Sequence, residues 1–138
     1  MNQEYFGHPG RLVANSSTYF DATCEHGCTG SRKETCRLPS WQIWAKPMAG
    51  GAQAVLVVNV ADSPSTSTIA VQLAELNMSG PAAVRDLWAH TDNGTVSAAF
   101  EVPAGLPAHG GAMVLLTPSS STSSGSTAAA THHLVAAL

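Results

Sequence analysis

The sequence contains little charge, and the charge it has is not basic. Only 11% of its 138 residues are Asp, Glu, Lys or Arg, and the formal net charge is −3. A protein that binds a nucleic acid backbone needs a basic surface, so this composition predicts no nucleic acid partner. No apolar run reaches the roughly 20 residues of a membrane-spanning helix, so no membrane partner is expected either.

Motifs for catalysis and for cofactor binding are also missing from the sequence. The serines occupy no Gly-x-Ser-x-Gly elbow, no glycine-rich phosphate loop follows a strand pattern, and most carboxylates fall in loops or beside turns. We therefore expect no catalytic residue, no cofactor and no metal ligand in this chain. Asp86 is the exception in a predicted strand, and we expect a structural role for it, through a bulge or a hydrogen-bonded side chain.

Neither end of the chain has the pattern of a folded element. Residues 1–11 lack the basic and apolar regions of a signal peptide, so any export signal is expected to lie outside this chain. Residues 119–138 are mostly Ser, Thr, Ala and Gly, and they bury too little apolar surface to offset the entropy cost of ordering. They are predicted to be a disordered tail.

What the sequence does contain is a series of short β-strand patterns separated by turns. Alternating or continuous apolar runs predict strands at residues 41–47, 54–58, 68–73, 84–88, 95–102 and 113–116. Asn93-Gly94 predicts the turn of a hairpin, because both residues accept positive φ. The spacing predicts an all-β domain over residues 41–118, a small antiparallel β-sandwich of Greek-key type.

All three cysteines lie in one polar segment, CEHGCTGSRKETC, ahead of the predicted sandwich. Cys24, Cys28 and Cys36 could form a zinc site with His26, but their spacing lacks the two close pairs of ligands usual in structural zinc sites. The preferred interpretation is one disulfide that closes a surface loop, with the third cysteine free or bonded elsewhere. The segment itself is expected to be irregular.

Trp41 and Trp44 begin the predicted sandwich. Because they are three residues apart, a regular strand places them on opposite faces, and they cannot form one flat platform for a sugar ring. We expect them to lie in the core or in an interface.

Five segments of the chain, taken in order, resemble the C-terminal end of α-galactosidases of glycoside hydrolase family 27. They are NQEYFGHPGR, WQIWAKPM, AQAVLVVNVADSPSTSTIAVQLAEL, VRDLWAHTDNG and PAHGGAMVLLTP. In that family the catalytic barrel ends in an Asn-Gln-Asp segment, and the C-terminal domain opens on a Val-Trp-Ala-Lys-Pro-like strand and carries Arg-Asp-Leu-Trp. The matches are clearest at residues 44–47 and 85–88, while Glu4 replaces the usual aspartate.

The resemblance implies that residues 1–40 are the end of a truncated (β/α)8 barrel plus the cysteine-containing loop, with Met1 an internal methionine. It implies that two aspartates upstream of Asn2 hydrolyse terminal α-galactosides by a retaining mechanism, and that residues 41–118 are a non-catalytic domain. The expected partner is that barrel, docked near Trp41 and Trp44, with galactosides bound through it. Homo-oligomerisation of the full-length enzyme is a further expectation.

Two alternatives stay open, an independent carbohydrate-binding module and a small zinc-binding interaction module. Three N-glycosylation sequons begin at Asn15, Asn77 and Asn93, all in predicted loops or turns. Together with the cysteines and the resemblance, these sequons predict a secreted, lysosomal or vacuolar parent protein.

Overall fold

The computed structural model describes residues 9–26 and 32–119. Within these ranges the chain forms β-strands and two 3-10 turns, η1 (Ala49–Gly51) and η2 (Leu73–Leu76). The strands are β1 (Arg11–Asn15), β2 (Tyr19–His26), β3 (Arg32–Pro39), β4 (Trp41–Pro47), β5 (Gln53–Asn59), β6 (Ile69–Gln72), β7 (Ala82–Asp86), β8 (Asp92–Val96), β9 (Ala99–Val102) and β10 (Gly111–Pro118). The all-β prediction is confirmed. The predicted tail lies outside the described residues from position 120 onward.

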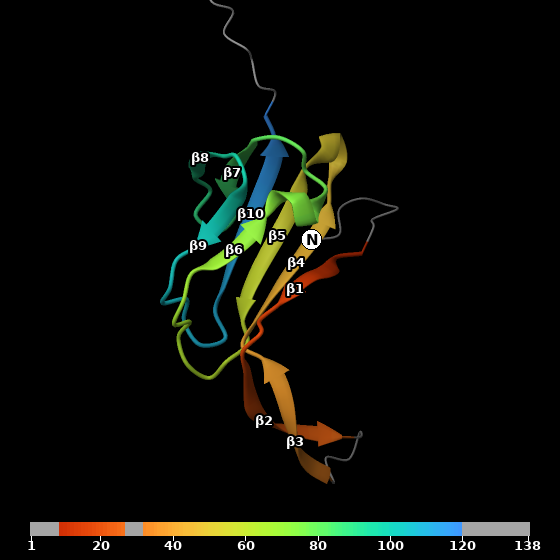
Figure 1. The fold of residues 1–138 in the computed structure, drawn as a ribbon, viewed down its shortest axis with the longest axis vertical. Helices are drawn as coiled ribbons and strands as arrows, with labels where there is room; N and C mark the ends of the chain where they lie inside the picture. The colour runs from red at the N-terminus through yellow and green to blue at the C-terminus, as the bar shows by residue number, and fades with distance from the viewer. Residues whose placement is uncertain (1–8, 27–31, 120–138) are drawn as a thin grey trace, which may run out of the picture.

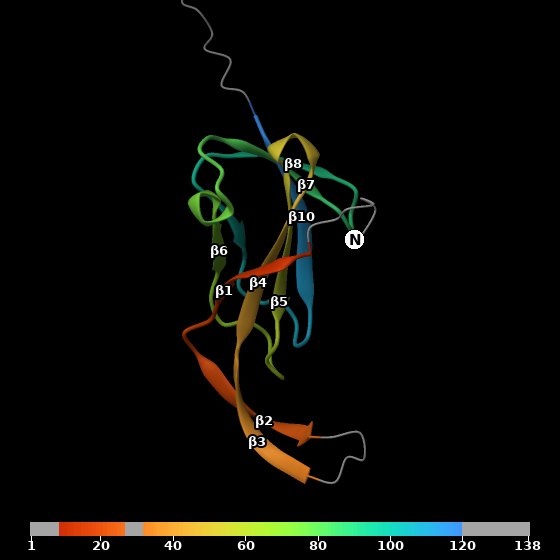
Figure 2. The same cartoon turned by 90° about the vertical axis from the view of Figure 1, so that its right-hand side faces the viewer.

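All strands except β2 and β3 form a two-layer β-sandwich, which Figure 2 shows from its edge. One layer is a six-stranded sheet in the order β1-β4-β5-β10-β7-β8, and the other is the pair β6-β9. All of these pairings are antiparallel, and β10 lies between β5 and β7, so strands distant in sequence are neighbours. The predicted antiparallel sandwich is confirmed.

The hydrophobic core lies between the two layers. Alternate residues of the six-stranded sheet point into it, as strand geometry requires. Four of its strands, β4, β5, β7 and β10, each contribute a pair of buried residues: Ile43 and Ala45, Val55 and Val57, Ala82 and Val84, Val114 and Leu116. The second layer contributes Ile69, Val71 and Val102, and η2 contributes Leu73 and Leu76. The face of the six-stranded sheet that is turned away from this core is called the outer face below.

The prediction of a hairpin turn at Asn93-Gly94 was wrong. These residues lie inside β8, which pairs with β7. The register passes from Ala83↔Thr95 to Arg85↔Asp92, so β8 carries one extra residue at this point. Gly94 has φ of 79°, and this positive φ forms a bulge instead of a turn. The single strand predicted over residues 95–102 is therefore divided, because β9 pairs with β6 in the other layer.

The cysteine-containing segment was predicted to be irregular, and that prediction was also wrong. β2 and β3 form a regular hairpin with continuous register from Tyr19↔Pro39 to His26↔Arg32. Backbone hydrogen bonds at its base continue the β1–β4 ladder, because Ser16 N–H donates to Trp41 O at 2.9 Å and Ser40 N–H donates to Thr18 O at 2.9 Å. The hairpin, called the arm below, projects away from the sandwich (Figures 1 and 2).

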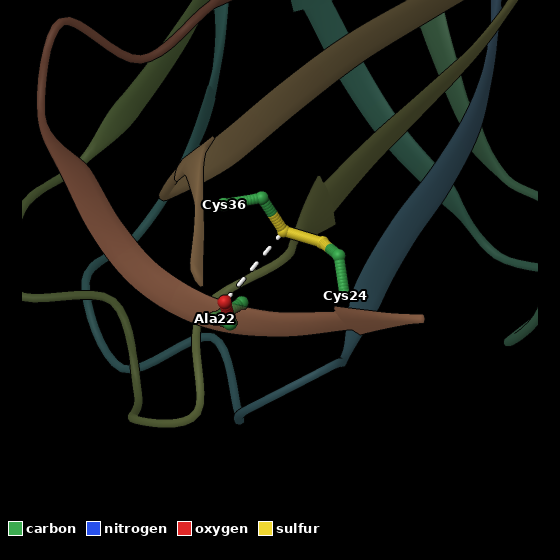
Figure 3. Close-up of a disulfide and its surroundings, with 3 residues drawn as sticks. All are labelled: Ala22, Cys24 and Cys36. Carbon is green, nitrogen blue, oxygen red and sulfur yellow. Dashed lines mark hydrogen bonds between the residues drawn. A yellow bond between two sulfur atoms is a disulfide. The ribbon is translucent and has the colours of Figure 1, made fainter. Parts of the chain in front are cut away.

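A disulfide between Cys24 and Cys36 joins the two strands of the arm (Figure 3). The predicted disulfide is thus confirmed, and Cys28 lies outside the described residues. Cys36 Sγ lies 3.6 Å from the carbonyl oxygen of Ala22. This is a packing contact, since a disulfide sulfur carries no hydrogen to donate. Because both thiols are consumed, the zinc site that needed all three cysteines is excluded.

Candidate functional site

The carboxylates of the described residues lie at the surface or have structural roles. Asp86 Oδ1 accepts hydrogen bonds from the backbone N–H groups of Trp88 and Ala89, both at 2.8 Å, so it stabilises the turn that ends β7. The structural role predicted for Asp86 is confirmed. Asp92 forms an ion pair with Arg85 at 2.7 Å. The Arg85 side chain is 44% exposed and the Asp92 side chain is 78% exposed.

Neither metal binding nor membrane insertion is indicated by the described part of the chain. Residues 9–26 and 32–119 contain no cluster of three or more His, Cys, Asp or Glu side chains that could hold a metal ion. In the same ranges, no helix has the length and apolar character that a membrane crossing requires.

Trp41 and Trp44 lie on opposite faces of β4, as predicted. Trp41 is half-buried and packs against the core from the inner side. Trp44 lies on the outer face and is 37% exposed, with its Nε1–H donating to Gln42 Oε1 at 3.1 Å. Of the two tryptophans, only Trp44 is therefore presented by the outer face.

A row of large apolar side chains crosses the outer face. The register places Leu12 of β1 opposite Trp44, Trp44 opposite Leu56 of β5, and Leu56 opposite Met113 of β10. Residues directly opposite each other on neighbouring strands point to the same face. These four side chains are consequently neighbours, and Leu12 is 39% exposed.

Trp88 extends this row from the turn that follows β7. A Cβ added at Gly111 would lie 3.2 Å from the Trp88 ring, 3.5 Å from Leu56 and 3.0 Å from the carbonyl oxygen of Val57. The indole therefore lies over Gly111 beside Leu56, in space that only glycine leaves open. Trp88 is 58% exposed. Leu12, Trp44, Leu56, Met113 and Trp88 together are called the outer apolar face.

A shallow hollow borders the outer apolar face. Its volume is about 370 Å³, and Arg85 and Asp92 are among the residues that line it. Leu115, Thr95 and Thr117 also line it. Within the described residues, no strand covers this side of the six-stranded sheet.

Sequence reasoning missed most of this face. Leu12, Met113 and Trp88 come from three separate segments, and only the strand register brings them beside Trp44. The sequence does contain one signal for this face. In β5 and β10 the residues that alternate with the buried core residues, such as Leu56 and Met113, are apolar too. A strand that is apolar on both faces indicates that both faces meet apolar surroundings.

The hollow beside Trp41 gives no support for an independent sugar-binding site. The hollow beside Trp41 is lined by several hydroxyl groups, among them those of Thr18, Ser40 and Ser63, but its volume is only about 120 Å³. Ligand pockets typically measure roughly 300–1,000 Å³. Asn59, which lines it, already uses its side chain in hydrogen bonds to neighbouring loops.

The fold and this face define a two-layer antiparallel β-sandwich module with one sheet face open to a partner. Residues 39–116 match the family described as "Alpha galactosidase C-terminal beta sandwich domain". The chain belongs to this family. It is the C-terminal β-sandwich domain of the GH27 alpha-galactosidase family, and the catalytic part is not in this chain.

Similar proteins agree with this assignment. The chain is 36% identical over 77 residues to a probable alpha-galactosidase of Dictyostelium discoideum, covering 56% of this chain and 20% of that protein. It is 33% identical over 119 residues to alpha-galactosidase 3 of Arabidopsis thaliana, covering 86% of this chain and 22% of that protein. It thus spans about a fifth of these curated relatives.

The fold also matches a solved structure. A GH27 β-L-arabinopyranosidase from Geobacillus stearothermophilus superposes with a TM-score of 0.60 over 83% of this chain and 20% of that chain, at 23% identity. At this identity the match supports the fold of the sandwich.

Proposed function

We propose that this domain docks on the catalytic (β/α)8 barrel of an α-galactosidase-like enzyme and stabilises it, using the outer apolar face. The observation that carries the proposal is a set of partly exposed large apolar side chains on one sheet face, with Trp44 37% and Trp88 58% exposed. Contiguous exposed apolar surface of this kind marks interaction sites. The relatives are about five times as long as the matched region, so each supplies a large further segment as the partner.

In this proposal the sandwich begins earlier in the chain than the sequence predicted. β1 is hydrogen-bonded to β4 in the six-stranded sheet, and Leu12 of β1 belongs to the outer apolar face. We therefore place the end of the barrel within residues 1–10 and the start of the sandwich at Arg11, with its end near Pro118. Trp41 is removed from the proposed docking residues because it packs toward the core.

Covering the outer apolar face would contribute substantially to stability. Interfaces between domains commonly bury roughly 600–1,500 Å². With about half of that area apolar and about 25 cal/mol per Å², the contribution is on the order of 10 kcal/mol as an upper estimate. This is comparable to the whole stability of a small domain, so docking would dominate the stability of the sandwich.

The proposed chemistry of the whole enzyme rests on the similarity to relatives that are alpha-galactosidases or a probable alpha-galactosidase. We propose that the parent protein removes terminal α-galactosyl residues with retention of configuration. That reaction uses two carboxyl groups about 5–5.5 Å apart, and we assign both to the barrel. This domain would affect the rate of hydrolysis only by keeping that barrel folded.

The proposed compartment is oxidising. The Cys24–Cys36 disulfide and the exposed sequon residues Asn15, Asn77 and Asn93 support a secreted, lysosomal or vacuolar location.

Substitution on the outer face tests the proposal in the full-length enzyme. Trp44→Glu and Trp88→Glu should lower its melting temperature and separate the unfolding of the two domains in calorimetry. The isolated chain should melt almost as before, because neither side chain belongs to its core. Glu101→Lys, at an exposed position in the other layer, is the matched control. An unchanged melting profile of the full-length enzyme would refute docking through this face.

A further inference from the structure

We propose that Asn77 carries an N-linked glycan whose first sugar lies in a hollow at one end of the sandwich. Asn77-Met78-Ser79 is an N-glycosylation sequon. It lies between η2 and β7, on a segment that takes no part in the outer apolar face. The inference does not depend on docking to a barrel.

The turn at Asn77 leaves the two sequon residues that glycosylation requires, Asn77 and Ser79, exposed to solvent. Asn77 has φ of 57° and ψ of 32°, and Met78 N–H donates to Leu73 O at 3.0 Å, which closes the turn. The Met78 side chain is 8% exposed and packs in the core. The residues on either side of this buried side chain, Asn77 and Ser79, are both exposed.

The amide of Asn77 is available for modification. Asparagine in the left-handed conformation is tolerated because its side chain can bond locally, yet no hydrogen bond from the described residues engages this side chain. By contrast, Asn93 Oδ1 accepts a hydrogen bond from Thr91 Oγ1 at 3.3 Å. Asn15 lies in β1, where its backbone pairs with Gln42 of β4.

A hollow of about 600 Å³ opens directly beside Asn77. Pro81 and Pro118 provide apolar walls, on which the C–H face of a pyranose can pack, and Gly51 leaves one side free of a side chain. Ser119 holds the wall in place, since its N–H and its hydroxyl both donate to Pro81 O, at 2.9 and 3.0 Å. The volume of this hollow falls within the range of roughly 300–1,000 Å³ typical of small-ligand sites, so one sugar ring fits.

The disulfide supplies an independent argument for the compartment. Disulfides form and persist in oxidising compartments such as the endoplasmic reticulum lumen, and N-glycosylation sequons are used in secreted proteins. A chain that acquires the Cys24–Cys36 bond there would expose the Asn77 sequon to the glycosylation machinery.

The test is translation of the full 138-residue chain, behind a cleavable signal, with endoplasmic-reticulum microsomes. Protease protection confirms translocation, and mass spectrometry of the peptide that contains Asn77 reports the modification. Asn77→Gln and Ser79→Ala should each remove one glycan. Asn15→Gln and Asn93→Gln are matched controls, and both should retain the Asn77 glycan. Translocated protein in which Asn77 is unmodified would overturn the proposal.

A second measurement tests the position of the first sugar. If that sugar lies in the hollow, an endoglycosidase should release the glycan about tenfold more slowly from the folded chain than from the urea-unfolded chain, because release then requires local opening. Equal rates would show that the glycan extends into solvent and would overturn that part of the proposal.

Discussion

At the scale of single residues, Asn59 shows how one buried polar side chain holds the loops of the sandwich together. It lies at the end of β5 and is 1% exposed. Its Nδ2 group donates toward the carbonyl oxygens of Ser63, Leu106 and Pro107 at 2.8, 3.0 and 2.9 Å, and its Oδ1 accepts from Ala61 N–H at 3.2 Å. Two loops far apart in sequence are thereby fixed to one strand end.

Replacing Asn59 by Asp should be more damaging than replacing it by Ala. The Asp carboxylate places a negative oxygen against three carbonyl oxygens in a buried site, while Ala only leaves them unpaired. We expect Asn59→Asp to lower the free energy of unfolding by about 3–5 kcal/mol and Asn59→Ala by about 2–3 kcal/mol, measured by urea denaturation.

The control for Asn59 is Gln72→Glu, the same amide-to-carboxylate change at an exposed position of β6. It should change the free energy of unfolding by no more than about 0.5 kcal/mol. If Asn59→Asp were as stable as the parent sequence, the hydrogen bonds assigned to Asn59 would not hold the loops.

At the scale of elements, the strands that pack against the core could be predicted from the sequence, because the core requires alternating apolar residues. The strands of the arm could not be predicted in this way. β4, β5 and β6 pack against the core, and their apolar patterns were sufficient to predict them. The arm forms a sheet of its own, so no buried face imposes an apolar period on β2 and β3. Positive φ at Gly94 was also anticipated, but whether glycine forms a turn or a bulge depends on the partner strand, which local sequence does not specify.

The arm should depend on its disulfide while the sandwich should not. Cys24 and Cys36 are separated by 12 positions, and closing a loop of this size contributes about 3 kcal/mol. In a Cys24→Ser/Cys36→Ser variant, hydrogen-exchange protection of arm amides should fall by about 100-fold. The amides of β5 and β10 should keep their protection, because β2 and β3 pair only with each other. Equal losses in β5 would contradict this independence.

At the scale of the whole molecule, the sandwich has one sheet face covered and one open. β6 and β9 cover the inner face of the six-stranded sheet, and the outer apolar face is exposed in the described residues (Figure 2). The family could be inferred from short motifs such as Arg85 to Trp88, but the docking face could not. It depends on the register among β1, β4, β5 and β10, which the three-dimensional fold sets.

The isolated chain should be inactive toward a chromogenic α-galactoside. Asp92 forms a surface ion pair and Asp86 supports a turn, and we assign both catalytic carboxyl groups to the barrel, so we expect hydrolysis no faster than the buffer background. The full-length enzyme, assayed in parallel, is the positive control. Turnover by the isolated chain that Asp92→Asn abolishes would reveal an active site within the sandwich.

Oxidative footprinting tests the central claim, docking through the outer apolar face, most directly. Hydroxyl radicals modify exposed aromatic and sulfur-containing side chains, so oxidation of Trp44, Trp88 and Met113 can be compared between the isolated chain and the full-length enzyme by mass spectrometry. The account predicts that all three are oxidised several-fold more slowly in the full-length enzyme. The exposed His109, in the loop before β10, should react equally in both and serves as the internal reference. Equal oxidation of Trp44 and Trp88 in the two proteins would show that no partner covers this face.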